Sequence, residues 1–209
     1  MLWQDTPSVV MGKHQRVQSE VDREWAELQQ IHIARRFSGG GTVYHDLGNV
    51  NLTFIETVSR LPDFKTYLHR VLEFFVSIGL TAEGDERLGI YLHGLKISGS
   101  AQCVYKNRVL YHCTLLYDTD MTILNKVLNP EGKIEEKESV PVYAVPSVRS
   151  AVTNISNYLP METIEDFKKT VFQYFSKGQS AVAFNEWELG VIDKLRKEKY
   201  IRDEWIFSR

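Results

Sequence analysis

Residues 35–54 read RRFSGGGTVYHDLGNVNLTF, and this stretch decides the fold. The apolar run at 31–33 just before it predicts a strand that leads into the triple-glycine turn Gly39–Gly41. Between 50 and 54 apolar and polar residues alternate, which predicts a half-buried strand after the turn. A glycine turn between two strands lets backbone amides approach a ligand closely, because glycine carries no side chain.

Helix and strand patterns alternate over the rest of the chain. Apolar residues three or four positions apart predict helices over 17–30, 63–77, 162–177 and 186–199. Short apolar runs predict further strands at 9–12, 90–92, 95–100 and 110–116. The proline-rich, charged segment 130–146 is predicted to be a mobile surface loop. Together these elements predict one α+β (mixed α/β) domain over 1–209, with a mixed sheet flanked by helices.

Composition excludes several classes of protein. Lys and Arg total 25 against 27 Asp and Glu, without a basic block, so no nucleic-acid partner is expected. No apolar run is long enough to span a membrane, and the first residues lack the pattern of a signal peptide. Cys103 and Cys113 are too few for a disulfide framework. We expect a soluble intracellular protein, cytoplasmic or, in a eukaryote, mitochondrial.

Polar side chains surround the glycine turn and form the first candidate site. Arg35, Arg36, Ser38 and His45 would place hydrogen-bond donors around a cradle for phosphate or carboxylate oxygens. A flexible hairpin turn with two solvated arginines would share the triple glycine alone, but the flanking polar residues favour a ligand site.

Two later motifs carry chemistry of the same kind. Residues 96–101 read KISGSA, which sets the cation of Lys96 beside a second turn of small residues and suits an anionic intermediate. Residues 111–116 read YHCTLL. In a strand, His112 and Thr114 would lie on one face and Cys113 on the other.

These three motifs, in this order and spacing, resemble those of the lipoate–protein ligase A and lipoyltransferase family. Further matches occur near residues 2–15, in the segment 147–155 that reads SVRSAVTNI, and at Glu204-Trp205. The resemblance covers nearly the whole chain. It implies a biotin/lipoate protein ligase-type catalytic domain.

The resemblance also implies roles for particular residues. Lys96 corresponds to the catalytic lysine that contacts the acyl-adenylate, and Trp3 and Val10 would wall an apolar tunnel for the acyl chain. The residues implied in binding lipoyl-AMP or ATP are Trp3, Val10, Arg36, Ser38, Gly40, Gly41, Thr42, Val43, His45, Ser98, Gly99, Ala101, His112 and Thr114. The ligands of a metal ion are not identified.

The chemistry implied is ATP-dependent activation of lipoate to lipoyl-AMP, with Mg²⁺ and Lys96 offsetting phosphate charge. The lipoyl group then passes to a lysine of an acceptor protein. The implied acceptors are lipoyl domains of 2-oxoacid dehydrogenase complexes or the H protein of glycine cleavage.

The resemblance departs from the family pattern in three places. Gly89 stands where many members carry an aspartate, and Gln102-Cys103 stands where many carry an arginine. The family's N-terminal strand and helix and its C-terminal accessory domain are expected to be absent, and a separate accessory polypeptide would then complete the ligase. On these grounds transfer from pre-made lipoyl-AMP is expected to be faster than adenylation.

Two alternatives stay open beside the ligase. The first is a lipoyl or octanoyl transferase that uses a pre-activated or protein-bound acyl donor, for which Cys103 or Cys113 could be the nucleophile. Both thiols are more simply interpreted as small packing residues. The second is a non-catalytic relative that binds a lipoyl domain, which the presence of Lys96, Arg36 and His45 disfavours.

Overall fold

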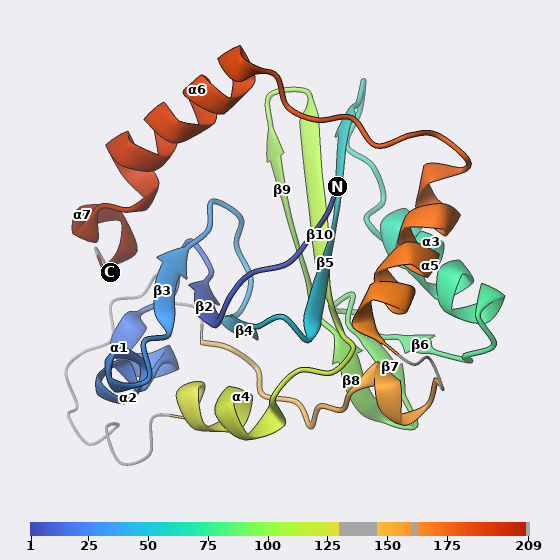
Figure 1. The fold of residues 1–209 in the computed structure, drawn as a ribbon, viewed down its shortest axis with the longest axis horizontal. Coiled ribbons are helices and arrows are strands. Elements are labelled where there is room, and N and C mark those ends of the chain that lie inside the picture. Colours follow the sequence, from blue (N-terminus) through green and yellow to red (C-terminus); the bar gives the residue numbers. More distant parts are fainter. Residues whose placement is uncertain (130–145, 160–162, 208–209) are drawn as a thin grey trace.

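A computed structural model of the protein describes residues 1–129, 146–159 and 163–207. Within these ranges the α+β fold is confirmed, with small sheets set among helices (Figure 1). The largest sheet has four antiparallel strands in the order β1 (Leu2–Trp3), β5 (Asn49–Thr57), β10 (Arg108–Leu116) and β9 (Ser100–Tyr105).

Two three-stranded sheets accompany the four-stranded one. In the first, β2 (Ser8–Met11) lies between a parallel β3 (His32–Arg35) and an antiparallel β4 (Val43–His45), so this sheet is mixed. In the second, β6 (Glu83–Gly84), β7 (Ile90–Leu92) and β8 (Leu95–Ser98) are antiparallel. The glycine turn follows β3, as the sequence predicted, and leads into β4, which the sequence did not reveal.

The main core lies between the four-stranded sheet and two helices, α3 (Lys65–Ser77) and α5 (Ile164–Ser176). Figure 1 shows both helices on the same side of β5 and β10. Phe74 of α3 and Phe167 of α5 are fully buried, and their rings meet at 6.2 Å. Each such side chain contributes about 1.5–3 kcal/mol by leaving water.

The opposite face of β5 and β10 is polar, but it is also buried. Asn51 is 2% exposed, Thr53 7% and Thr114 7%. The alternation predicted for residues 50–54 is confirmed, whereas the prediction that one face meets solvent was wrong. A further layer, built from β2, β4 and the glycine turn, covers this face, and Thr53 and Thr114 line an interior space between the two layers.

A second core packs beneath the β2 sheet, around Met11, Tyr44 and Ala26. Helices contribute to it from α1 (Val17–Glu20), α2 (Arg23–Leu28), α4 (Met121–Val127) and α7 (Asp203–Ile206). The prediction of one helix over 17–30 was wrong because Val21 is extended. Asp22 caps a new helix there by accepting a hydrogen bond from the Trp25 amide at 3.1 Å.

Other predicted elements agree with the structure to within a few residues. The strand predicted at 95–100 ends at Ser98, and the chain turns at Gly99 into β9, which the sequence did not reveal. The helix predicted at 186–199 is α6 (Glu186–Leu195), followed by a π-helical turn, η2 (Arg196–Tyr200). A short 3-10 helix, η1 (Ile155–Asn157), precedes α5. The predicted loop at 130–146 lies outside the described residues except for Pro146.

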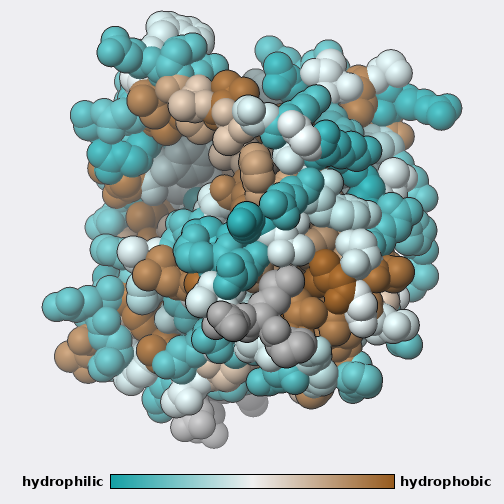
Figure 2. Space-filling view, turned by 45° about the vertical axis from the view of Figure 1, so that its right-hand side comes forward, coloured by the Kyte–Doolittle hydropathy of each residue, from teal (hydrophilic) through white to brown (hydrophobic). Residues whose placement is uncertain are grey.

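The surface is mainly hydrophilic on the face shown in Figure 2, with hydrophobic side chains gathered in separate patches. Among the helices in the described ranges, none combines the length and apolar character that crossing a membrane requires.

A substitution at Gly12 tests the close contact between β2 and the glycine turn. A Cβ at this position would lie 2.0 Å from the Gly40 carbonyl oxygen, so backbone must move. We expect Gly12→Ala to lower the free energy of unfolding in urea by about 1–3 kcal/mol.

The matched control is Gly190→Ala, because a Cβ at this position in α6 meets nothing within 4 Å. It should raise the free energy of unfolding by about 0.5–1 kcal/mol, since alanine is the better helix former. An unchanged stability in Gly12→Ala would contradict the contact.

Candidate functional site

A cavity of about 640 Å³ lies over the polar face of β5, β10 and β9. The glycine turn and β2 form its opposite wall. The site residues predicted from the sequence that line this cavity are Trp3, Val10, Arg36, Ser38, Gly40, Gly41, Thr42, Val43, His45, Lys96, Gly99, Ala101, His112 and Thr114. Three stretches far apart in the sequence therefore meet in one place.

Ser98, a predicted site residue, does not line either cavity described here. Its side chain is completely buried, next to the Cys113 thiol on the core side of the sheet. Alternation along β8 does not account for this direction, because Lys96, two residues earlier, lines the cavity. The next residue in the chain, Gly99, lines the cavity too.

A second cavity of about 510 Å³ adjoins the first. Its own walls come from α1, β4, α4 and the segment 146–152, and include Glu20, Tyr44 and Val152. Lys96, Gly99 and Thr114 line both cavities. Lys96 therefore lies at the junction, where it could reach ligand groups in either cavity.

Arg36 holds the glycine turn in shape. Its guanidinium donates to the Gly39 and Gly41 carbonyls at 2.7 Å each, to the Val10 carbonyl at 2.9 Å and to the Ser38 hydroxyl at 3.2 Å. Burial lowers the pKa of Arg36 to about 10, so it keeps its charge at neutral pH. The phosphate contact predicted for Arg36 stays a prediction. In the structure its guanidinium donates mainly to carbonyls of the glycine turn and β2.

Arg35, predicted to donate toward the same ligand, points elsewhere. Its guanidinium donates to the carbonyls of Gly12, Gln15 and Ile206 at 2.7–2.9 Å. The Trp205 indole donates to the Arg35 carbonyl at 2.8 Å. Arg35 thus joins β3 to the turn after β2 and to α7.

A polar network that sequence reasoning did not find fixes the other side of the turn. The Gln15 side chain accepts from the Gly12 amide and the Thr42 hydroxyl, and donates to the Ser147 hydroxyl at 2.8 Å. Ser147 in turn accepts from the Thr42 amide, and its own amide donates to buried Glu20. The motif positions of Gln15 and Ser147 were noted, but only the folded chain shows that they meet.

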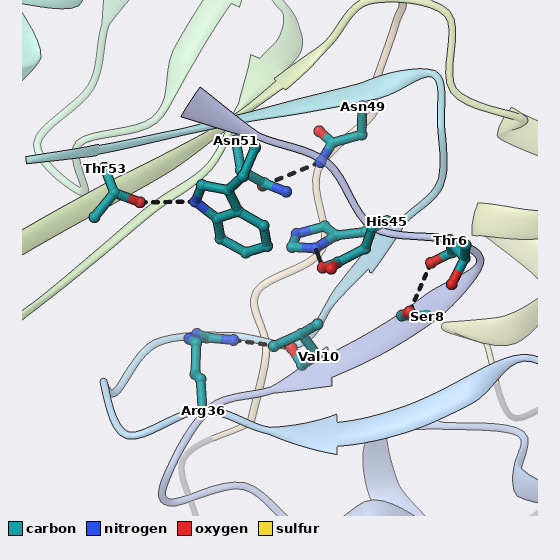
Figure 3. Close-up of polar contacts among 10 residues, drawn as sticks. Thr6, Ser8, Val10, Arg36, His45, Asn49, Asn51 and Thr53 are labelled. Carbon is teal, nitrogen blue, oxygen red and sulfur yellow. Dashed lines mark hydrogen bonds and ion pairs between the residues drawn. The ribbon is translucent and has the colours of Figure 1, made fainter. Parts of the chain in front are cut away.

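Histidines line the larger cavity at two points. The Ser38 hydroxyl lies 2.7 Å from His112 Nε2, and His45 Nδ1 lies 3.0 Å from an Asp5 carboxylate oxygen. Figure 3 shows Arg36, His45 and Thr53 around a common space. The Trp3 indole donates a hydrogen bond to the Thr53 hydroxyl at 3.0 Å. In the described part of the chain, His45 Nε2 is buried without a partner.

His112 is neutral at physiological pH. Burial lowers its pKa to about 4, and the positive charge of Arg36 and the nearby His45 add to this effect. The cavity therefore holds the cations of Arg36 and Lys96 and the uncharged imidazole of His112 beside the Ser38 hydroxyl. This combination suits an anionic ligand group.

A carboxylate beside Lys96 was not found from the sequence. Burial lowers the pKa of Lys96, and the negative charge of Asp85 opposes this. Asp85 accepts from the Gly89 amide at 2.7 Å and from the Tyr91 hydroxyl at 2.9 Å. A Cβ at Gly89 would lie 3.3 Å from Asp85 Oδ1, so Asp85 reaches the space beside Gly89.

The two cysteines lie in different surroundings. Cys113 is buried in the main core, as the alternation in β10 predicted, and burial raises its pKa to about 12. Cys103 lines the larger cavity, and burial raises the pKa of its thiol too. Neither environment favours a thiolate nucleophile.

No cluster of three or more His, Cys, Asp or Glu side chains that could hold a metal ion occurs within the ranges the structure describes. Asp85, the carboxylate beside Lys96, already accepts three hydrogen bonds. These residues do not form a protein-only metal site.

Comparison with known proteins identifies the family. The sequence model of the lipoyl protein ligase A/B catalytic domain matches residues 1–176. The chain belongs to this family. It is 34% identical to lipoate–protein ligase 1 of Staphylococcus aureus over 97% of the chain. It is 37% identical to the human mitochondrial lipoyl amidotransferase over 78% of the chain and 43% of that protein. The chain spans 61–64% of the length of the bacterial ligases it matches.

Solved structures of lipoate ligases share the fold. A bi-partite lipoate protein ligase from Thermoplasma acidophilum, described with its E2 lipoyl domain, matches with a TM-score of 0.83 and 27% identity over 99% of this chain and 82% of that one. A lipoate–protein ligase A bound with ATP matches with a TM-score of 0.80 and 26% identity over 99% of this chain and 84% of that one.

The depressed pKa of His112 makes stability depend on pH. Between its folded pKa of about 4 and the ordinary value of 6.5, the unfolded chain binds a proton that the folded chain does not. The free energy of unfolding therefore rises with pH across this window, by at most about 1.4 kcal/mol per pH unit from this residue.

We expect His112→Gln to flatten this slope, measured by urea unfolding at several pH values. His69→Gln, on the exposed side of α3, is the control and should keep the wild-type slope. Equal slopes in the wild type and His112→Gln would show that His112 takes up its proton normally in the fold.

Proposed function

We propose that this chain activates lipoate with ATP to lipoyl-AMP and transfers the lipoyl group to a lysine of a lipoyl domain. The observation that carries the proposal is the position of Lys96, whose side chain lines both adjoining cavities. An acyl-adenylate has an acyl part and a nucleotide part joined at one phosphate, so it fits two cavities that meet at a cation. We further infer that residues 1–209 act as one catalytic domain.

The acyl chain would occupy the larger cavity. On its floor Thr114 and His112 are followed along β10 by Leu110, and β9 places Cys103 opposite Leu110. The floor therefore changes from polar near Lys96 to apolar about 13 Å further along the strand. This gradient matches a carboxyl group at one end and a dithiolane ring at the other. Burying methylenes there contributes about 0.8 kcal/mol each.

The nucleotide would occupy the smaller cavity. Its lining combines apolar Leu116 and Val152 with the cations of Arg16 and Arg149. Apolar walls suit a purine ring, and arginines suit phosphate oxygens. The related ligase A bound with ATP supports ATP as the co-substrate. Mg²⁺ would enter with the triphosphate, because the described residues do not form a protein-only metal site.

Two steps follow from this arrangement. A lipoate carboxylate oxygen attacks the α-phosphorus of ATP, and pyrophosphate leaves. The neutral amine of the acceptor lysine then attacks the acyl carbonyl, AMP leaves, and the amine loses a proton to give the amide. Lys96, placed at the junction, offsets negative charge on the phosphate in both steps, and preorganised charge of this kind lowers the barrier.

The acceptor in this proposal is a lipoyl domain, either of a 2-oxoacid dehydrogenase complex or of the glycine cleavage H protein. The related archaeal ligase, which is described with its E2 lipoyl domain, supports this class of acceptor. Because that ligase is bi-partite, a separate accessory polypeptide also belongs to the proposal.

The deciding test is pyrophosphate release with lipoate and ATP as the only substrates. We expect Lys96→Ala to lower this rate and the transfer from synthetic lipoyl-AMP by about 100- to 1,000-fold each, as for loss of one preorganised donor. Exposed Lys106→Ala is the control and should keep the wild-type rates. Near-normal transfer by Lys96→Ala would remove Lys96 from the mechanism.

The cysteines test the route of the acyl group. If an adenylate is the acyl donor, Cys103→Ser and Cys113→Ser should each keep most of the transfer rate, because both thiols have raised pKa values. Intact mass spectrometry of the chain during turnover should find no acyl-thioester. Detection of one on either cysteine would instead establish a transferase that carries the acyl group covalently.

A further inference from the structure

The chain returns to the glycine turn after α6. Residues 196–206, called here the C-terminal arm, include η2 and α7 and lie beyond residues 1–176, which the catalytic-domain model matches. Figure 1 shows α6 on the outside of the molecule and α7 beside β3. The arm contacts both residues that flank Arg36, the arginine that shapes the turn.

The first contact is made through Arg35. Its Nε donates to the Ile206 carbonyl at 2.9 Å, and the Trp205 indole donates back to the Arg35 carbonyl at 2.8 Å. Arg35 is 3% exposed, so these bonds are shielded from water and fix the end of β3 to α7.

The second contact is made through Phe37. Lys199 Nζ lies 5.0 Å from the centre of the Phe37 ring, 4.0 Å from Trp205 and 5.1 Å from Tyr200. Tyr200 and Trp205 meet edge to face at 5.7 Å. Three aromatic rings thus surround one ammonium, which attracts the negative faces of the rings.

Phe37 connects this cluster with the cavity. Its ring lines the larger cavity, and the next residue, Ser38, bonds both Arg36 and His112. Because the arm holds Arg35 and Phe37, it also holds the backbone of Arg36 between them. From this position the Arg36 guanidinium donates to the Gly39 and Gly41 carbonyls. The shape of the turn therefore depends on side chains more than 150 residues away in sequence.

We propose that the C-terminal arm positions the glycine turn for the acyl ligand, with Lys199 as a positioning residue that acts through Phe37. The link to lipoate rests on the proposed function, whereas the hold on the turn does not. The π-helical turn η2 contributes Lys199 and Tyr200 to the aromatic cluster around Phe37. Lys197 of the same turn pairs with Asp193 instead.

The hold on the turn is tested without any ligand by hydrogen exchange of the amides of residues 36–41. We expect Lys199→Met to accelerate this exchange about three- to ten-fold, with partial loss only, since Lys13 also contacts the Phe37 ring. Lys199→Arg should restore the wild-type rate, because a guanidinium also stacks on aromatic rings. Lys197→Met is the matched control and should exchange as the wild type does.

Lipoate affinity, measured by calorimetry on the same proteins, tests the consequence. We expect Lys199→Met to bind lipoate about three- to ten-fold more weakly and to raise KM for lipoate more than it lowers kcat. Lys199→Arg and Lys197→Met should bind as the wild type does.

Each other outcome decides between the two proposals. Wild-type exchange in Lys199→Met, acceleration of equal size in Lys197→Met, or no rescue by arginine would overturn the positioning role. If the turn loosens only in Lys199→Met but the wild-type chain binds no lipoate, the positioning role stands and the proposed function fails.

Discussion

The register between β5 and β10 is the constraint on which both the core and the site depend. His112 is opposite Thr53, and Cys113 is opposite Leu52. Side chains alternate along a strand, so a slip of β10 by one residue against β5 would turn Cys113 into the cavity and His112 into the core. Because both faces are buried, such a slip would destabilise the fold in two ways. Apolar side chains would lose their packing against α3 and α5, and the His112 imidazole would lose its partner Ser38.

This same alternation explains what the sequence could predict. In YHCTLL the alternation of residue types along the strand already predicts that His112 and Cys113 lie on opposite faces. Nearly all predicted cavity residues lie on strands of this kind or in the glycine turn. The failures have another origin. Ser98 and Arg35 have the right residue types for a site, but their direction is set by neighbours distant in sequence. The break at Val21 and the bonds between Gln15 and Ser147 likewise depend on packing that no local pattern encodes.

Charge in the cavity is arranged by burial as much as by residue type. Arg36 donates hydrogen bonds to the glycine turn, and its positive charge also lowers the pKa of His112, which helps to keep that imidazole neutral. Asp85 lies beside Lys96, where it opposes the effect of burial on the pKa of that lysine. An anionic ligand in the larger cavity would therefore meet the cations of Arg36 and Lys96 beside the neutral imidazole of His112. At Gly89 the sequence has no carboxylate, but the Asp85 side chain lies beside this position and accepts a hydrogen bond from the Gly89 amide.

The position of Lys96 shows how the separate sheets serve one site. Its amide donates to the Ala151 carbonyl at 2.8 Å, and its carbonyl accepts from the Thr153 amide at 3.0 Å. This parallel bridge ties β8 to the segment that walls the smaller cavity, while Gly99, three residues on, turns the chain into the floor of the larger one. The lysine backbone is thus held by the wall of the smaller cavity, and the residue lines both cavities. Because Lys96 lies where the two cavities meet, its ammonium would lie at the phosphate that joins the two halves of the proposed acyl-adenylate.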